Sequence, residues 1–194
     1  MEFICCSLAT IILKNNSTNR VLGWPGPLYI TSMKNHHYQT TVIWTGNTGD
    51  GTKDYKSYER CHDINVEGKH VILGSSDPNF RGDSSRYNPE DLLVASVSSC
   101  HMLWYLHLCT TAGIVVTAYE DKAEGVMMEN KDGSGCFTVI LLTPVITITD
   151  SSQIEKANEL HKEANKMCFI ANSCNFPILH EAQYKIETLS QATA

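Results

Sequence analysis

The sequence predicts an α+β domain, and three observations lead to this fold class. Short β-branched and aromatic segments separated by turns precede one long apolar segment that reads as a helix. Three further strand-like segments follow that helix. A second, amphipathic helix then precedes a last strand. The predicted order, β-β-β-α-β-β-β-α-β, lacks the strict strand–helix alternation of a doubly wound sheet.

The first three strands are predicted between residues 38 and 76. Residues 38–46, YQTTVIWTG, are rich in β-branched and aromatic residues and end at a Gly/Asn/Asp cluster. Residues 61–76 predict two short strands around a turn at Glu67-Gly68-Lys69. The polar residues 76–89, with two prolines, two arginines and a glycine, then predict a surface loop or lid.

The long helix has recognisable ends. Asn88 is the expected N-cap, Pro89 takes the first helical position, and Glu90 and Asp91 are acidic residues in the first turn. Gly113 is expected to stop the helix.

Apolar residues surround this helix almost entirely, so it is expected to be buried in the protein core. A membrane span is disfavoured because the segment is short for a bilayer and is interrupted by polar residues. These are Ser96, Ser98, Ser99, His101 and His107.

The remaining elements follow Gly113. Strands are predicted over residues 114–119, 123–128 and 136–150, the last one bent or shortened at Pro144. Residues 151–168 predict the second helix, with a capping box made by Ser152 and Glu155. Residues 178–188 predict the last strand. One face of the second helix carries Ile154, Ala157, Leu160, His161, Ala164 and Cys168.

Composition excludes several classes of function. The 194 residues are 42% apolar and 19% charged, which is typical of one globular domain. A net charge of −6 without a basic run argues against nucleic-acid binding. The eight cysteines form no CxxC pair and no zinc-like spacing. We therefore expect mostly reduced thiols and a cytoplasmic protein.

Residues 1–32 differ from the rest of the chain. They hold the apolar run FICCSLATIIL and a turn-like GWPGPLY. A targeting peptide is the alternative interpretation, but Glu2 makes its start acidic and no clear cleavage site follows. We predict a dispensable N-terminal extension over residues 1–32 and a single domain over residues 33–194.

Cys100, in the middle of the long helix, is the first candidate for chemistry. A thiol in apolar surroundings is inert unless a cation reaches it, and simple packing is the alternative. The candidate cations are Arg60, Arg81 and Arg86, which all precede the helix. Glu90 and Asp91 could orient an arginine, and Cys168 provides a second thiol. A thiol, a guanidinium, a carboxylate and a second thiol together make a peroxide-reducing site.

The other cysteines and histidines have simpler interpretations. His101 is expected to be a core or interface residue, because neighbours on a helix point about 100° apart. His107 is too far along the helix to activate Cys100 in a hydrolase. Cys109 is expected to pack in the core, and Cys61 and Cys136 are expected to be packing residues in strands. Cys174 is the alternative second thiol. Four apolar residues of the long helix are expected in the core or in an interface: Met102, Leu103, Trp104 and Leu106.

Two segments resemble a known family. Residues 86–108, RYNPEDLLVASVSSCHMLWYLHL, and residues 161–173, HKEANKMCFIANS, are similar to the OsmC/Ohr family of thiol-dependent hydroperoxide reductases. The resemblance runs from about His37 to Glu187. This chain lacks the glycine-rich arginine turn of the organic-hydroperoxide branch and is closer to an OsmC-like branch.

The resemblance implies an OsmC-like fold: two antiparallel-rich sheets wrapped around two long central helices in an intertwined homodimer, with a site at each side of the interface. It implies Cys100 as the peroxidatic cysteine, Cys168 as the resolving cysteine and Glu90 as the carboxylate that holds the catalytic arginine. Arg60 is the best match for that arginine, with Arg81 and Arg86 as alternatives. No metal and no bound cofactor is implied.

The leading hypothesis is therefore a cysteine-based peroxidase in oxidative-stress defence. It would reduce organic hydroperoxides, and also hydrogen peroxide, through a Cys100 sulfenic acid and a Cys100–Cys168 disulfide that an external dithiol, such as a lipoyl-type reductant, reopens. The alternative is a non-catalytic dimer that holds an apolar ligand at its subunit interface. A hydrolase using Cys100 with His101 or His107 is a third hypothesis.

Overall fold

The computed structural model describes residues 34–187. The chain divides into two units, Met1–Tyr38 and Gln39–Ala194. Of the first unit only residues 34–38 are described, and these are exposed and form no helix or strand. The predicted extension over residues 1–32 lies outside the described residues.

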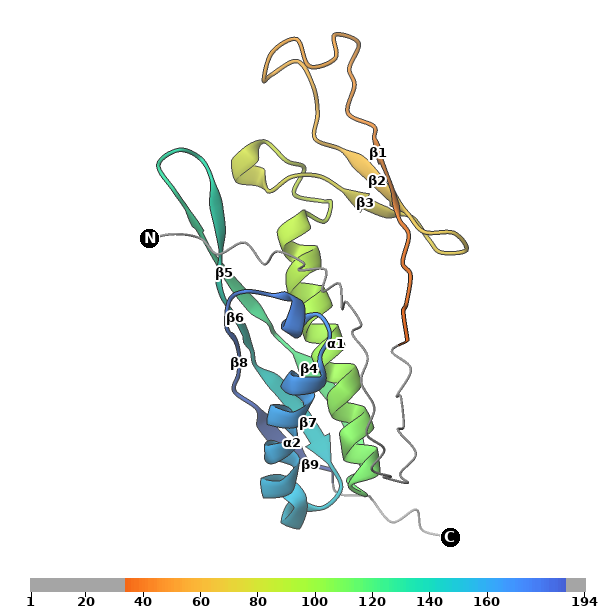
Figure 1. Cartoon of the computed structure of the whole chain (residues 1–194), viewed down its shortest axis with the longest axis vertical. Coiled ribbons are helices and arrows are strands. Elements are labelled where there is room, and N and C mark those ends of the chain that lie inside the picture. The colour runs from red at the N-terminus through yellow and green to blue at the C-terminus, as the bar shows by residue number, and fades with distance from the viewer. Residues whose placement is uncertain (1–33, 188–194) are drawn as a thin grey trace, which may run out of the picture. The chain divides into compact units, whose positions relative to one another are not determined.

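The second unit contains nine strands and two α-helices within the described residues, with short 3-10 turns between some of them. The strands and helices are, in chain order, β1 Thr41–Trp44, β2 His62–Asn65, β3 Ile72–Gly74, α1 Pro89–Thr111, β4 Val116–Asp121, β5 Glu124–Glu129, β6 Gly135–Leu142, β7 Pro144–Ile148, α2 Ile154–Met167, β8 Ile178–His180 and β9 Gln183–Ile186. The mixed composition and the order confirm the predicted α+β class (Figure 1).

The strands form three sheets in the described residues, where two were expected. Their orders are β1-β2-β3, β4-β7-β9 and β5-β6-β8. The pairs β1–β2, β2–β3, β4–β7 and β5–β6 are antiparallel, whereas β6–β8 and β7–β9 are parallel. Antiparallel pairing thus predominates, as expected.

The extra sheet arises because two predicted strands are each divided. The predicted strand over residues 136–150 ends at Leu142 and resumes at Pro144, whose nitrogen cannot donate to a ladder. The Asp121 carboxylate accepts a hydrogen bond from the backbone N–H of Thr143 at 2.8 Å, which satisfies the donor at this break. The last predicted strand divides into β8 and β9 beside this break, because the Glu181 N–H, between β8 and β9, donates to the carbonyl of Leu142, the last residue of β6, at 2.8 Å.

The ends of α1 agree with the prediction. The Asn88 side chain accepts from the Asp91 N–H at 2.6 Å, and the Asp91 carboxylate accepts from the Asn88 N–H at 3.2 Å. Pro89 is the first helical residue, and Gly113 has a φ of 73°, a left-handed conformation that ends the helix.

The start of α2 differs from the prediction. The helix begins at Ile154, and its N-cap residue, Gln153, makes no side-chain capping bond. The capping box predicted from Ser152 and Glu155 is therefore wrong. Instead the Asp150 carboxylate accepts from the backbone N–H of Ser152 at 2.9 Å, so the cap stabilises a 3-10 turn that precedes the helix.

The prediction that α1 is buried is wrong for the single chain. By length and composition this helix could cross a membrane, yet only 22% of its most apolar 18-residue window is buried. Core helices of soluble proteins meet the same criteria, so one such helix is weak evidence for a span. Only Val97, His101, Tyr105 and Cys109 are buried, whereas Leu103 is 63% exposed. Much of α1 is therefore left uncovered by the rest of residues 34–187.

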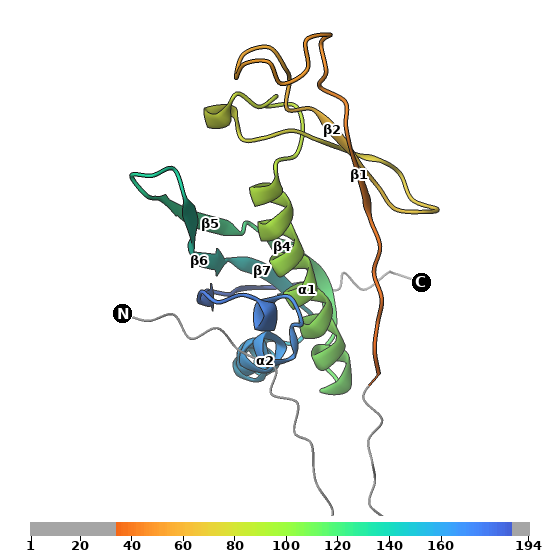
Figure 2. The same cartoon turned by 45° about the horizontal axis from the view of Figure 1, so that its top comes forward.

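The core lies between α1, α2 and the two C-terminal sheets (Figures 1 and 2). One hydrophobic cluster joins the C-terminal half of α1 to α2, β7 and the segment after α1. A second joins Val97 to Ile140 and Leu142 of β6. Ala157, Leu160, His161, Ala164 and Cys168 are all buried, which confirms the inward face predicted for the second helix.

The β1–β2–β3 sheet is different, because neither hydrophobic cluster includes any of its residues. In both views it lies beyond the N-terminal end of α1 (Figures 1 and 2). Its exposed apolar side chains are Val42, Ile43 and Trp44 on β1, with Ile72 and Leu73 on β3. An apolar surface of this kind is typical of a contact region for another chain.

Candidate functional site

The two predicted thiols meet in the structure. Cys100 lies on α1 and is half-buried, whereas Cys168 caps the C-terminal end of α2 and is fully buried. Burial, and next the contact with the neighbouring Cys100 side chain, raise the pKa of the Cys168 thiol to about 11. Both cysteines are free thiols, so the structure corresponds to the reduced state.

The turn after α2 holds the Cys168 sulfur in place. The Cys168 N–H donates to the Ala164 carbonyl at 2.9 Å, which ends the helix. The backbone N–H of Ala171 donates to the Cys168 Sγ at 3.3 Å, and the Asn172 N–H donates to the Cys168 carbonyl at 3.0 Å. These bonds fix the Cys168 backbone, and the Ala171 N–H donor stabilises the sulfur as a thiolate forms.

A pair of buried histidines lies beside the thiols. His101, the residue after Cys100, is 1% exposed, which confirms the expectation of a core histidine. Its Nε2 lies 2.9 Å from Nδ1 of His161 on α2, and the two rings are parallel. Burial lowers the pKa of His101 to about 4 and that of His161 to about 3, so both imidazoles are neutral at pH 7. The sequence indicated that His161 faces inward but gave no sign of this pairing.

Arg60, the expected catalytic arginine, is held within its own loop. Its Nη1 donates to the Tyr58 carbonyl at 2.5 Å and its Nη2 to the Tyr55 carbonyl at 2.7 Å. The guanidinium also lies over both tyrosine rings, 4.3 Å and 4.2 Å from their centroids. Within the described part of this chain, no hydrogen bond joins Arg60 to Cys100.

The two alternative arginines are not at the thiols either. Arg86 makes ion pairs with Asp63 at 3.7 Å and with Asp83 at 3.6 Å. Arg81 is exposed, adopts a left-handed φ of 66°, and lies 5.9 Å from the Tyr55 ring. The three arginines thus gather around the loops between β1 and α1, and none forms a hydrogen bond with Cys100 within residues 34–187.

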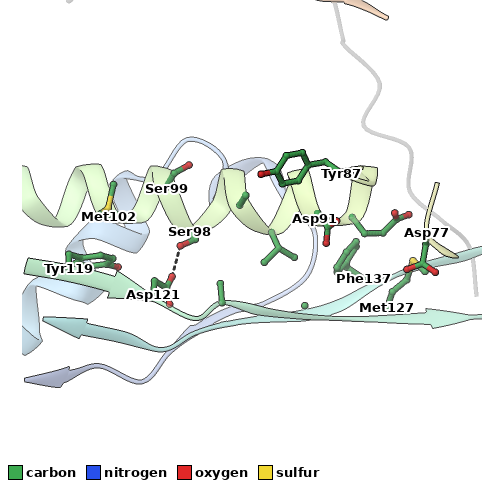
Figure 3. A pocket seen from close by; sticks show the side chains of 15 residues that line it. Asp77, Tyr87, Asp91, Ser98, Ser99, Met102, Tyr119, Asp121, Met127 and Phe137 are labelled. Atoms are coloured by element: carbon green, nitrogen blue, oxygen red, sulfur yellow. Dashed lines mark hydrogen bonds between the residues drawn. The ribbon is translucent and has the colours of Figure 1, made fainter. Parts of the chain in front are cut away.

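A groove of about 860 Å³ lies between α1 and the strands β4 to β6 (Figure 3). Glu90 is one of the residues that line it. Its Oε2 is buried and has no hydrogen-bond partner among the described residues. The groove is acidic, because Asp77, Asp91 and Asp121 also line it and no described Lys, Arg or His does. A buried carboxylate oxygen without a partner is costly, so the position favours a cation.

The groove and the thiol pair lie on different sides of α1. Ser98 and Met102 line the groove, and Figure 3 shows Ser98 directed at Asp121, whose carboxylate accepts its hydroxyl hydrogen bond. Ser98 and Met102 each stand two residues from Cys100, which places them about 160° away around the helix. The groove therefore does not lead to the Cys100 sulfur within one chain.

The other cysteines are divided between core and surface. Cys109 is buried in the larger hydrophobic cluster, as predicted. Cys136 lies on β6, as predicted, but it is exposed, so the prediction that it packs as filler is wrong. Cys61, which lies just before β2, and Cys174 are partly buried. Cys174 donates to the Ile170 carbonyl at 3.3 Å, and burial raises the pKa of its thiol.

Two further features bear on alternative chemistry. His107 is exposed on α1, with its ring edge-on to Trp104 at 5.9 Å. Its place on the exposed side of the helix offers no support for a hydrolase. Within residues 34–187 no group of three or more His, Cys, Asp or Glu side chains is arranged to hold a metal ion.

Comparison with known proteins identifies the family of this chain. The model of the OsmC family, described as OsmC-like protein, matches residues 82–182. No match was found among curated proteins.

Solved structures with the same fold cover most of the chain. A Vibrio cholerae OsmC-like protein of unknown function is 27% identical, with a TM-score of 0.70 over 76% of this chain and 99% of that one. An OsmC-like protein from Mycoplasma pneumoniae is 14% identical, with a TM-score of 0.60 over 79% and 100%. An organic hydroperoxide resistance protein from Elizabethkingia anophelis is 17% identical, with a TM-score of 0.57 over 79% and 100%.

Proposed function

The chain belongs to the OsmC-like family, and on this premise we propose that it is a thiol-dependent hydroperoxide reductase that acts in oxidative-stress defence. The contact between Cys100 on α1 and Cys168 at the C-terminal end of α2 carries the proposal, since it brings together two thiols that are far apart in the sequence. The name of the Elizabethkingia anophelis structure, an organic hydroperoxide resistance protein, agrees with this activity.

The reaction has three steps. The Cys100 thiolate attacks the O–O bond, becomes a sulfenic acid, and releases an alkoxide that takes a proton to give the alcohol. The Cys168 sulfur then attacks the sulfenic sulfur, which releases water and closes the disulfide. An external dithiol in the cytoplasm, such as a lipoyl-type reductant, reduces the disulfide to two thiols and is itself oxidised. Organic hydroperoxides are favoured because Trp104, one turn after Cys100, and Phe169, directly after Cys168, place two aromatic rings near the thiols, with centroids 6.0 Å apart.

The first step needs a cation at Cys100, and we propose that a second copy of the chain supplies it. A guanidinium stabilises both the thiolate and the departing oxygen anion. Arg60 is the proposed residue, with Glu90 as the carboxylate that orients it. The buried Oε2 of Glu90 has no hydrogen-bond partner among the described residues, and a guanidinium N–H would provide one, which supports this role.

The surface of the chain supports a homodimer. Leu103 of α1 is 63% exposed, and the apolar side chains of β1 and β3 are also in solvent. Apolar patches of this kind occur where subunits meet. In the proposed dimer the β1–β3 sheet of one subunit covers the open side of α1 in the other, which brings the arginine loops to the partner's thiols.

Turnover assays of the purified protein test the mechanism. We expect Cys100→Ser to abolish consumption of tert-butyl hydroperoxide with a dithiol present. Cys168→Ser should consume one equivalent and then stop, because no disulfide forms for the reductant to open. Cys109→Ser is the matched control, since Cys109 is a buried cysteine of the same helix away from the pair. Normal turnover by Cys100→Ser would remove the mechanism.

A non-catalytic dimer that binds an apolar ligand is the second candidate. The apolar side chains that line the groove beside its carboxylates favour it; they include Val94, Met102, Met127 and Phe137. Thiol labelling distinguishes the two functions. A catalytic Cys100 should react with a thiol reagent rapidly near neutral pH in the folded protein, whereas a structural Cys100 should react only on unfolding. Peroxide turnover without rapid labelling would contradict both schemes.

A further inference from the structure

Three histidines from three elements stack beside the thiol pair. His101 of α1 and His161 of α2 have parallel rings with centroids 5.3 Å apart. The His180 ring, at the end of β8, lies 5.9 Å from the first and 5.3 Å from the second. Tyr105, one turn after His101, stacks on His161 at 4.0 Å. On α1, His101 stands one turn after Val97, which belongs to the smaller hydrophobic cluster, and one turn before Tyr105, which belongs to the larger one. The stack therefore begins between the two clusters.

The hydrogen bond within this stack joins the two helices. Nε2 of His101 lies 2.9 Å from Nδ1 of His161, so one ring donates and the other accepts. The other nitrogens, His101 Nδ1 and His161 Nε2, are buried and have no hydrogen-bond partner in the described part of the chain. Among residues 34–187 this is the one side-chain hydrogen bond between α1 and α2 that does not involve sulfur.

The His101–His161 hydrogen bond lies close in sequence to both thiols. His101 follows Cys100 on α1, and His161 lies two turns before Cys168 on α2. A hydrogen bond of defined geometry at this point fixes the rotation and the register of one helix against the other. Apolar contacts alone do not fix register in this way, because they are not directional.

We propose that the His101–His161 hydrogen bond positions the two thiols: it holds α1 against α2 so that Cys100 and Cys168 meet, and so sets how readily their disulfide closes. The inference rests on the proposed function, since it concerns the same two cysteines. The histidines do not touch the peroxide, so they are positioning residues and not catalytic ones.

Amide substitutions test this geometry in a crossed design. A glutamine can place its amide where Nε2 stands in histidine, and an asparagine where Nδ1 stands. His101→Gln and His161→Asn should therefore keep the bond, whereas His101→Asn and His161→Gln should lose it. The exposed His107 gives the matched control, His107→Asn.

The readout is the equilibrium constant for the Cys100–Cys168 disulfide in glutathione redox buffers, where one oxidised glutathione is reduced to two thiols as the disulfide forms. The variants that lose the bond should lower this constant by roughly fivefold, the effect of one hydrogen bond. The variants that keep the bond, and the control, should stay within about twofold of wild type. Circular dichroism confirms folding, and either position alone decides the outcome if a variant of the other fails to fold.

Two results would overturn the inference. One is the same constant for all four amide variants, since a role in filling space or polarity alone predicts no crossed pattern. The other is a wild-type protein that forms no Cys100–Cys168 disulfide. Peroxide consumption is measured separately. A crossed pattern without peroxide consumption removes the proposed function and keeps the positioning role, and a flat pattern with normal consumption does the reverse.

Discussion

The region of α1, α2 and the C-terminal sheets contrasts with the β1–β3 sheet. In the first region Ile146 of β7 is fully buried, whereas in the second Ile43 of β1 is 52% exposed. The thiol pair lies in the first region, and the arginines lie in the loops around the second. Residues 34–187 of one chain thus bring together the two thiols of the proposed reaction, whereas the proposed cation, Arg60, lies in a different region of the same chain.

The largest expected effect concerns the arginine. We predict that Arg60→Ala lowers the rate of peroxide consumption by about 100-fold, which is typical for the loss of one group that stabilises a developing anion. Mixing it with Cys100→Ser should restore activity, because a mixed dimer then holds one intact Cys100 and one intact Arg60 facing each other. The measurement is turnover of the separate and co-refolded variants. Absence of recovery would place the cation in the same subunit as the thiol.

The second prediction compares the stability of the two regions. Ile146→Ala should cost about 2–5 kcal/mol of unfolding free energy, because it opens a cavity in a closed core. This loss should not depend on protein concentration. Ile43→Ala should cost less, and its cost should grow at the concentrations where the protein is dimeric. Denaturant titrations at two concentrations measure both, and a concentration-independent cost for Ile43→Ala would contradict the proposed dimer contact.

The third prediction concerns pH and the buried histidines. Burial lowers the pKa of His101 to about 4 and that of His161 to about 3, so the unfolded chain binds these protons first. Each histidine therefore contributes stability that is fully present above about pH 6.5 and is lost as the pH falls toward its folded pKa. The loss is about 1.4 kcal/mol per pH unit for each group.

Urea unfolding between pH 7 and pH 4 measures this slope. The double variant His101→Gln, His161→Asn should flatten it, because the amides do not titrate. An unchanged slope in the double variant would assign the acid sensitivity to other groups.

The smallest expected effect is at the start of α1, where the packed region meets the loops. Asn88→Ala removes one side of the capping box and should cost about 1 kcal/mol. Asp91→Ala, which removes the reciprocal bond, should cost a similar amount, and the double variant less than the sum. Thermal unfolding measures these differences, and additive losses would show that the two bonds act independently.

Local signals in the sequence predicted much of the fold. Asn88, Pro89 and Gly113 define the limits of α1 because capping and left-handed glycine are properties of a few adjacent residues. The inward face of α2 follows from its 3.6-residue period. The division of the long strand at Pro144 was only partly foreseen, since the partner bonds that fix the break, from Thr143 to Asp121, span distant residues.

The site was less predictable. The two cysteine motifs pointed to Cys100 and Cys168 through their resemblance to a family, and the structure brings these thiols together. The His101–His161 bond joins residues 60 positions apart, so no periodicity could reveal it. The exposure of α1 was misjudged because an apolar helix reads the same in sequence whether its own chain or a second copy covers it.

Peptide mapping of the protein after one equivalent of tert-butyl hydroperoxide tests the central claim most directly. The account predicts that the peptide containing Cys100 becomes linked to the peptide containing Cys168, and that Cys100→Ser and Cys168→Ser each abolish the link. Oxidised protein in which both thiols stay free, or in which Cys100 links to Cys174 instead, would contradict it.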